Sequence, residues 1–251
     1  MPSDHDERFS GIGYEDFRRM ATDPSLSPTE KVGFPDAYRA GKEAAILRDI
    51  LSKASVLTMS GKTVLDIGPG CSGLALAVIE HCRKQDHNLL LVDSEEMLAQ
   101  LPSGSGITKF AAYYPECPAL IDAYQGRIDC IICYSVLHYI FVESNVWRFF
   151  DASLALLREG GQFLLGDIPN VSKRKRFFSS RNGIEFHKRF MKTDKEPSVQ
   201  FNIPEAGVID DSVVIALIQR ARLQGFDAYV VPQEPELPMA NRREDILITR
   251  P

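Results

Sequence analysis

Apolar residues gather in short continuous runs along the middle of the chain, and between these runs they recur every three or four positions. The continuous runs span residues 63–67, 88–92, 128–134 and 162–167, with a weaker one at 106–111. Helical spacing covers residues 74–83, 95–101 and 145–158. Continuous apolar runs are typical of strands that helices cover on both faces. The alternation therefore predicts an α/β fold with a doubly wound, parallel sheet.

The C-terminal part of the chain adds two more strands to this pattern. Residues 210–223 are amphipathic and Gly225 ends them, and strand-like runs follow at 226–231 and 245–249. Strands joined without a helix pair antiparallel or leave the sheet. We therefore expect a seven-stranded, mostly parallel sheet with an antiparallel last strand.

Two segments lie outside the predicted core, which comprises residues 61–170 and 209–251. Residues 1–60 carry helical spacing at 14–21 and 38–57, separated by a proline-bearing linker at 24–35. Residues 171–208 form an insertion between the fifth strand and the last helix. We expect this insertion to be a lid, a substrate contact or an oligomer contact.

A glycine-rich turn, Gly68-Pro69-Gly70, follows the first predicted strand. Glycine lets the backbone approach a ligand closely and adopt a positive φ angle. A pyrophosphate-binding loop needs an open G-x-G-x-x-G with no anion beside the phosphates. Asp66 stands two residues before Gly68, where its carboxylate would repel a phosphate. The turn therefore suits a cationic or amine-bearing ligand.

A second acidic residue, Asp93, ends the next strand, 23 residues beyond Gly70. A carboxylate at this position can accept hydrogen bonds from both ribose hydroxyls of a nucleoside. The alternative is an aspartate that only caps a helix. Ser94 next to it reads as the N-cap of a helix whose first turn holds Glu95 and Glu96.

Three stretches resemble the class I, Rossmann-like S-adenosylmethionine-dependent methyltransferases. Residues 63–73 resemble motif I of that family, and residues 129–139, which end in Ser135-Val136-Leu137-His138-Tyr139, resemble motif IV. Residues 156–165 resemble the helix, glycine turn and strand that usually follow. The likeness covers 61–170 well and 209–251 moderately, and it hardly reaches the two accessory segments.

The resemblance implies S-adenosylmethionine as the cofactor and assigns its contacts. These are Asp66, Gly68, Pro69, Gly70, Asp93, Ser94, Ala112, Tyr113 and Ser135. Asp66 would lie near the amino group of the cofactor, and Ser135 near the transferred methyl. Ala112 and Tyr113, or Tyr114, would meet the adenine, although the acidic residue often found there is missing. An N-terminal helical cover would close the site, with Phe34, Tyr38 and Arg39 on its inner face.

Methyl transfer to a hydroxyl is helped by a base that removes the proton. His138 is the first candidate, because an unperturbed histidine pKa near 6.5 suits this task at neutral pH. The alternative is a histidine that only packs or hydrogen-bonds at the start of a helix. Asp167, at the end of the fifth strand, is the second candidate, and His187 and Glu185 are weaker ones.

Several chemistries are disfavoured. No N/D-P-P-Y/F sequence follows the fourth strand, which argues against methylation of planar amino groups. No acidic cluster indicates a metal site. Cys130 and Cys133 form a C-x-x-C inside a predicted strand, where residues three apart point to opposite faces, so we expect buried free thiols.

Composition limits the partners. The 251 residues are 44% hydrophobic and 25% charged, with a formal net charge of −5, which gives no reason to expect a nucleic-acid binder. No stretch reaches the length of a membrane span. The N-terminus, with Asp4, Asp6 and Glu7 and no apolar core, is unlike a signal peptide. We therefore expect a cytoplasmic protein.

The insertion is rich in cations, namely Lys173, Arg174, Lys175, Arg176, Arg181, Lys188, Arg189, Lys192 and Lys195. They could bind phosphate or carboxylate on a substrate, or form a solvated helix face or a homodimer contact. We expect a small-molecule acceptor, methylated at a hydroxyl and sugar-like or anionic. A faint resemblance to methyltransferases of bacterial surface-polysaccharide synthesis suggests a nucleotide sugar or glycan. The alternatives are a nicotinamide-dependent oxidoreductase and a non-catalytic S-adenosylmethionine-binding protein.

Overall fold

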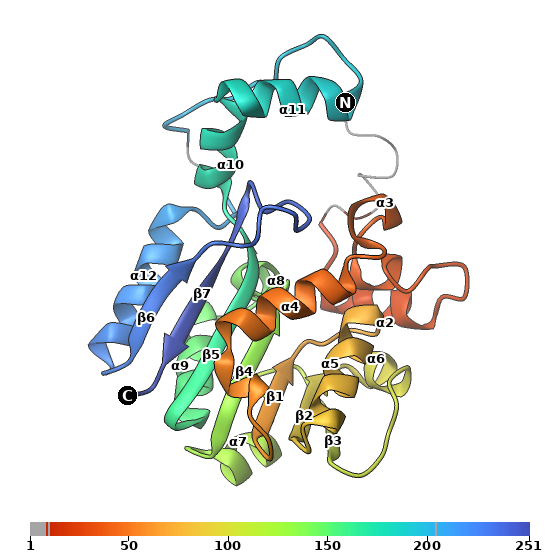
Figure 1. The fold of residues 1–251 in the computed structure, drawn as a ribbon, viewed down its shortest axis with the longest axis vertical. Coiled ribbons are helices and arrows are strands. Elements are labelled where there is room, and N and C mark those ends of the chain that lie inside the picture. Colours follow the sequence, from red (N-terminus) through yellow and green to blue (C-terminus); the bar gives the residue numbers. More distant parts are fainter. Residues whose placement is uncertain (1–8, 10, 204) are drawn as a thin grey trace.

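The computed structural model describes residue 9, residues 11–203 and residues 205–251. Asp4, Asp6 and Glu7, on which the expectation about a signal peptide depends, lie outside the described residues. A single seven-stranded sheet forms the centre of the described chain, with helices on both faces (Figure 1). This confirms the predicted fold class.

The strands appear in the order β3, β2, β1, β4, β5, β7, β6 across the sheet. Their bounds are β1 Thr63–Ile67, β2 Asn88–Asp93, β3 Ile107–Ala111, β4 Ile128–Tyr134, β5 Leu157–Pro169, β6 Asp227–Val231 and β7 Arg243–Thr249. β1 pairs in parallel with β2 and β4, and β7 lies antiparallel between β5 and β6. The last strand is antiparallel, as the helix-free connection predicted.

Successive strands are added on one side of β1 as far as β3, and from β4 onward they are added on its other side. The chain runs outward from β1 through β2 to β3, then returns to place β4 on the other side of β1. Ligands of doubly wound sheets bind beyond the carboxyl ends of the strands at such a switch point. Asp66 pairs with Leu91 and Ile132, so the acidic residue before the glycine turn belongs to the central strand.

Helices form two layers, one on each face of the sheet. The described helices are α2 Tyr14–Thr22, η1 Glu30–Val32, α3 Asp36–Arg39, α4 Glu43–Lys53, η2 Ser55–Thr58, α5 Gly73–Lys84, α6 Glu95–Ala99, α7 Pro118–Tyr124, α8 Leu137–Glu143, α9 Val146–Leu156, α10 Val171–Phe178, α11 Arg181–Met191 and α12 Asp211–Leu223. Apolar side chains of α4, α5 and α6 pack on one face, and those of α7, α8, α9 and α12 pack on the other. Cys130 belongs to the first core and Cys133 to the second, so they point to opposite faces, and both are free.

Three details differ from the prediction. The helix expected over 38–57 is broken into α3, α4 and η2: Gly41, with a left-handed φ of 77°, separates α3 from α4, and Ala54, with ψ of 74°, separates α4 from η2. The short helices α7 and α8 were not predicted. α9 ends at Leu156, and the chain enters β5 at once, so the turn at Gly160 lies inside β5 rather than ending the helix.

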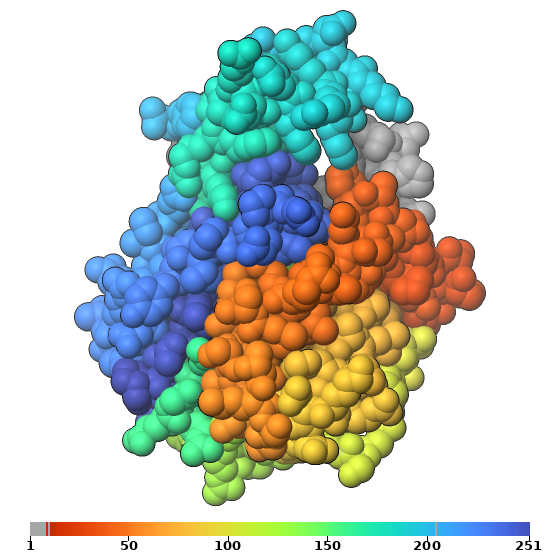
Figure 2. Space-filling model, viewed as in Figure 1, coloured from red at the N-terminus to blue at the C-terminus, as the bar shows by residue number. Residues whose placement is uncertain are grey.

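The two accessory segments meet beyond the carboxyl ends of the strands. α10 and α11 stand above the sheet, α3 lies below α11, and α2 lies lower, beside α6 (Figure 1). The space-filling view shows the teal insertion overhanging the blue connection between β6 and β7 and the orange-red N-terminal segment (Figure 2). Tyr38 of α3 contacts Phe190 of α11, with ring centres 5.7 Å apart. None of the described helices is both long and apolar enough to cross a membrane.

Candidate active site

A pocket opens at the switch point of the sheet, at the carboxyl ends of β1, β2 and β4. Seven of the nine predicted cofactor contacts line it: Gly68, Pro69, Gly70, Asp93, Ala112, Tyr113 and Ser135. Asp66 and Ser94 are buried, at 5% and 2% exposure, and are not among the lining residues. The structure thus brings residues from four separate stretches of the chain to one cavity.

The glycine turn forms the floor of this pocket, in a conformation that side chains would not allow. Gly68 and Gly70 adopt φ angles of 67° and 63°. A Cβ atom on Gly68 would lie 2.8 Å from Val136, and one on Gly70 would lie 2.6 Å from Val32. Both glycines are therefore needed for backbone geometry and for close approach. Because these two residues have no side chains, a ligand can lie close to the backbone of the turn.

The carboxylate of Asp93 is held in place by backbone donors from two elements. The N–H of Gly70 donates to Oδ2 at 2.9 Å, and the N–H of Ser94 donates to Oδ1 at 2.7 Å. Burial raises the pKa of Asp93 to about 6, against the lowering effect of these two hydrogen bonds. Ser94 caps α6 by accepting from Met97 N–H, as predicted.

Asp66 lies beneath the glycine turn and faces an apolar interior. Burial, and after it the charge of Asp93, raises the pKa of Asp66 to about 7. A cation placed beside a buried carboxyl group with a raised pKa stabilises the charged form of that group. The arrangement fits the expected neighbourhood of an ammonium group.

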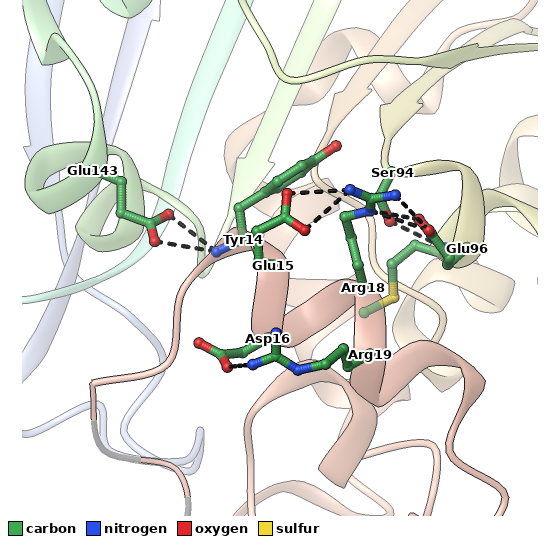
Figure 3. A network of polar contacts seen from close by, with 9 residues as sticks. Tyr14, Glu15, Asp16, Arg18, Arg19, Ser94, Glu96 and Glu143 are labelled. Atoms are coloured by element: carbon green, nitrogen blue, oxygen red, sulfur yellow. Dashed lines mark hydrogen bonds and ion pairs between the residues drawn. The ribbon is translucent and has the colours of Figure 1, made fainter.

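The N-terminal helix α2 forms the opposite wall, and polar contacts anchor it at its first residue and at its middle (Figure 3). The Tyr14 N–H donates to both carboxylate oxygens of Glu143 on α8, at 3.2 and 3.1 Å. Arg18 donates to Glu96 on α6, with an N–O distance of 2.8 Å. The Tyr14 ring meets Tyr113 edge-on, with centres 4.8 Å apart. Aromatic rings thus flank the place expected for adenine.

A buried charged cluster lies where the pocket meets the ends of β4 and β5. Arg39 of α3 donates to the Ser135 hydroxyl at 2.9 Å, and that hydroxyl donates to Asp167 in a short hydrogen bond. Arg243 pairs with Asp167 at 2.8 Å, and Arg39 lies 3.6 Å from it. All four side chains are at most one-tenth exposed. Charges this deeply buried are tolerated because they are paired.

Asp167 itself lines neither this pocket nor the cavity beside it. Its carboxylate already receives Ser135, Arg243 and, at 3.3 Å, the Gln233 amide. The geometry therefore favours a positioning role for this residue over the proton transfer expected from the sequence.

A second cavity, here called the acceptor cavity, adjoins the first pocket. Phe34, Tyr139 and Glu143 line both. His138 lines the acceptor cavity, and its buried Nδ1 has no hydrogen-bonding partner among the described residues. Burial, and after it the charge of Arg243, lowers the pKa of His138 to about 3, against the raising effect of Asp167. The ring is therefore neutral at pH 7 and a weaker base than the unperturbed histidine that the sequence suggested.

The other proposed residues fall in different places. Phe34 and Arg39 line the first pocket, and Tyr38 lines the acceptor cavity, so the N-terminal segment presents all three inward. Glu185 pairs with Arg181 on exposed α11, and His187 lies away from both cavities. In the part of the chain described, no group of three or more His, Cys, Asp or Glu side chains could hold a metal ion.

Sequence reasoning missed Tyr14 and Phe17 as pocket residues, and Arg243 as a partner of Asp167. The spacing of Tyr14 and Phe17, three apart on an amphipathic helix, was a usable signal that they share a face. Nothing local to Arg243 marks its role, since its partner lies 76 residues away.

Comparison with known proteins bears on the fold. No family model and no curated protein matches the chain. Solved structures do. The CurJ carbon methyltransferase matches with a TM-score of 0.56 and 15% identity over 90% of this chain, which spans 61% of the CurJ chain. NodS, an N-methyltransferase from Bradyrhizobium japonicum WM9 solved with S-adenosyl-L-homocysteine, matches with a TM-score of 0.52 and 13% identity, covering 94% of this chain and 95% of its own.

A candidate S-adenosylmethionine-dependent methyltransferase from Listeria monocytogenes matches with a TM-score of 0.52 and 18% identity, over 84% of this chain and 97% of its own. The chain has the methyltransferase fold. At these identities the likeness extends to the architecture of the sheet and its helices, which confirms the fold expected from the sequence.

Proposed function

We propose that the protein transfers a methyl group from S-adenosylmethionine to a hydroxyl of a small-molecule acceptor. The observation that carries this proposal is the meeting of the Gly68–Gly70 turn and Asp93 at one pocket of a methyltransferase fold, with Asp66 buried on the strand that leads into the turn. The methionine end would lie on the glycine turn above Asp66, the ribose at Asp93 and the adenine between Ala112 and Tyr113. Ser94 would support this site through the cap of α6.

The bound cofactor supplies an electrophilic methyl group on a sulfonium. The chain contributes placement and exclusion of water, which provide much of the acceleration in such a reaction. α2 and α3 close the pocket, and we propose residues 1–60 as its cover and 61–170 with 209–251 as the core. His138, whose Nδ1 has no hydrogen-bonding partner among the described residues, would accept the hydroxyl proton as the new C–O bond forms, and its lowered pKa makes it a weaker base than free histidine.

The acceptor would enter through the acceptor cavity, which shares a wall with the cofactor pocket. We propose a sugar-like or anionic acceptor, with nucleotide sugars and glycans as the first classes to test, and a cytoplasmic reaction. The insertion at 171–208 would contact this acceptor, and a homodimer contact of its exposed helix face is the alternative role.

The proposal is tested by incubating the protein with methyl-labelled S-adenosylmethionine and a panel of sugars, sugar phosphates and nucleotide sugars. Label in one acceptor, with equal release of S-adenosylhomocysteine and loss of both in Asp93→Ala, would support methyl transfer. Asp122→Ala, an exposed carboxylate on α7, is the matched control and should keep activity. Tight cofactor binding with no label in any acceptor would favour a non-catalytic binding protein.

A further inference from the structure

The insertion projects from the body of the molecule as an arm, defined here as residues 171–203. Its helices α10 and α11 stand beyond the carboxyl ends of the strands, and the space-filling view shows the teal arm at one end of the molecule (Figures 1 and 2). α11 crosses directly over the end of α10 because Gly183 has no side chain, and a Cβ atom there would lie 1.9 Å from the Phe177 carbonyl oxygen. The arm is therefore a fixed pair of helices that packs on itself.

The large apolar residues of the arm divide into a packed group and an exposed group. Phe177, Phe178 and Phe186 pack on one another, with ring centres 5.1 to 6.4 Å apart. The exposed group consists of side chains that are between 42% and 53% exposed: Phe190, Met191, Phe201 and Ile203. Phe190 contacts Phe186 and Tyr38, and half of its surface is still uncovered. The packing of the arm thus does not account for the exposed group.

The arm is also basic, although the protein is acidic. It holds nine lysine and arginine residues against three acidic ones, on a chain whose formal net charge is −5. Four of these cations form ion pairs: Lys175 with Glu205 at 2.7 Å, Arg176 with Asp211, Arg181 with Glu185 at 3.1 Å and Lys188 with Glu196 at 3.4 Å. Within the described chain no carboxylate pairs with Arg189, Lys192 or Lys195. The unpaired cations therefore gather at the end of α11 and just beyond it, where Asp194 is the one acidic residue between them.

Exposed apolar side chains among unpaired cations match the chemistry of an anionic lipid surface. A helix of this composition lies in the plane of the bilayer interface, with its apolar side chains among the acyl chains and its cations at the lipid phosphates. Each lysine or arginine near such a surface contributes about 1 kcal/mol. A nucleic acid would use the cations and stack on the rings, but it offers no counterpart to the aliphatic Met191 and Ile203. Because the arm projects, the acidic body of the protein stays away from the surface that the arm contacts.

We infer that the arm docks on the surface of an anionic lipid bilayer, with its exposed apolar side chains inserted and its unpaired cations at the lipid phosphates. The docking is peripheral, since no described helix is long and apolar enough to cross a membrane. α10 also lines the acceptor cavity, through Val171 and Arg174, so docking would place that cavity beside the bilayer. The inference goes beyond methyl transfer and does not depend on it.

The test is co-flotation of the full chain with vesicles of phosphatidylcholine alone and of phosphatidylcholine mixed with about 30% phosphatidylserine. We expect at least about tenfold tighter binding to the anionic vesicles at low salt, and weaker binding at about 1 M salt, where charge is screened. Arg189→Gln combined with Lys192→Gln should weaken binding by about tenfold or more, because two cations leave the headgroups. Phe201→Ser should weaken it by about fivefold, because an apolar anchor is lost.

Two substitutions outside the arm are the matched controls. Leu223→Ser removes an apolar side chain that is 84% exposed on α12, and Arg127→Gln removes an exposed cation between α7 and β4. Both should bind vesicles as the wild type does. All variants should keep their affinity for S-adenosylhomocysteine, whose titration reports separately on the proposed function.

Three results would overturn the inference. The first is a failure to bind anionic vesicles, or unchanged binding in both arm variants. The second is tighter binding of an RNA or DNA oligonucleotide than of vesicles, which would assign the arm to nucleic acid. The third is a dimer in analytical ultracentrifugation that Phe201→Ser dissociates, which would assign the exposed apolar group to a second copy of the chain.

Discussion

The Ser135 hydroxyl donates to the Asp167 carboxylate, and both residues adopt a left-handed backbone at the ends of neighbouring strands, with φ of 63° and 58°. Side chains other than glycine and asparagine adopt this conformation at a cost, and such residues gather at functional sites. Arg39 from the N-terminal segment and Arg243 from β7 meet the same pair. The contact between Ser135 and Asp167 therefore links the N-terminal segment to the sheet at a point that borders both cavities.

Asp167→Asn should destabilise the protein by about 3 kcal/mol, because it leaves two buried guanidiniums without their carboxylate. Asparagine tolerates the left-handed backbone, so the substitution isolates the charge. Urea unfolding of the variant measures the loss, and Asp227→Asn, exposed at the start of β6, is the control. A loss below about 1 kcal/mol, the range of a surface pair, would contradict the cluster's role.

Binding of S-adenosylhomocysteine should strengthen as pH rises from 5.5 to 8. The pKa of Asp66 is raised to about 7, so below that pH the carboxyl is protonated and cannot stabilise the ligand's ammonium group. Affinity should change by about tenfold for each pH unit below 7 if only the charged form binds. Asp66→Asn should bind weakly and lose the pH dependence centred near 7, leaving only the dependence below about pH 6 that the raised pKa of Asp93 causes. An unchanged profile in that variant would rule out Asp66 as the titrating group.

His138→Asn should gain stability relative to the wild type as pH falls. The pKa of His138 is lowered to about 3, so between pH 6.5 and 3 the unfolded chain binds a proton that the folded chain does not, and stability is lost as pH falls through this window. At pH 5 this loss amounts to about 2 kcal/mol. Urea unfolding of the wild type and the variant at pH 7.5 and at pH 5 gives the difference between their free energies of unfolding. Asp66 and Asp93, whose pKa values are raised, contribute equally in both proteins, so their effects cancel in this difference. If the difference in free energy of unfolding is the same at both pH values, the pKa of His138 is that of an ordinary histidine and the prediction is wrong.

Gly70→Ala should weaken S-adenosylhomocysteine binding by about tenfold or more, because the added Cβ would lie 2.6 Å from Val32 and must displace the N-terminal segment or the turn. Gly126→Ala is the matched control, since Gly126 has a φ of 65° and a Cβ added there would meet no atom within 4 Å. Both substitutions should cost about 1 kcal/mol of stability through the backbone. Only the first should affect binding, and Val32→Ala in the Gly70→Ala background should restore part of it.

The predictable part of this site is local in sequence. A strand, an acidic residue and a glycine turn lie within eleven residues at 63–73, and Asp93 ends the next strand, so pattern and spacing were enough to bring them together. The parallel, doubly wound sheet with an antiparallel last strand was also predictable, because the alternation of apolar runs and helical spacing can be read locally along the chain. α8 was missed because its residues are apolar on nearly every side, which leaves no helical period to read.

The rest of the site depends on contacts between distant residues. Arg39 lies 96 residues from Ser135, and no pattern around either marks the pairing. The pKa of His138 follows from burial and from Arg243, which only the folded chain brings near. The division of the basic insertion into paired cations and a cavity-lining Arg174 likewise needs the positions of Glu205, Asp211 and Phe178.

The central claim is that the pocket at the glycine turn binds S-adenosylmethionine. Calorimetric titration with S-adenosylmethionine, S-adenosylhomocysteine and NADH, repeated on Asp93→Ala and on the Asp122→Ala control, tests it most directly. We predict micromolar binding of the first two ligands, weakened at least about tenfold in Asp93→Ala and unchanged in the control. Binding of NADH alone would contradict the claim and favour a nicotinamide-dependent oxidoreductase.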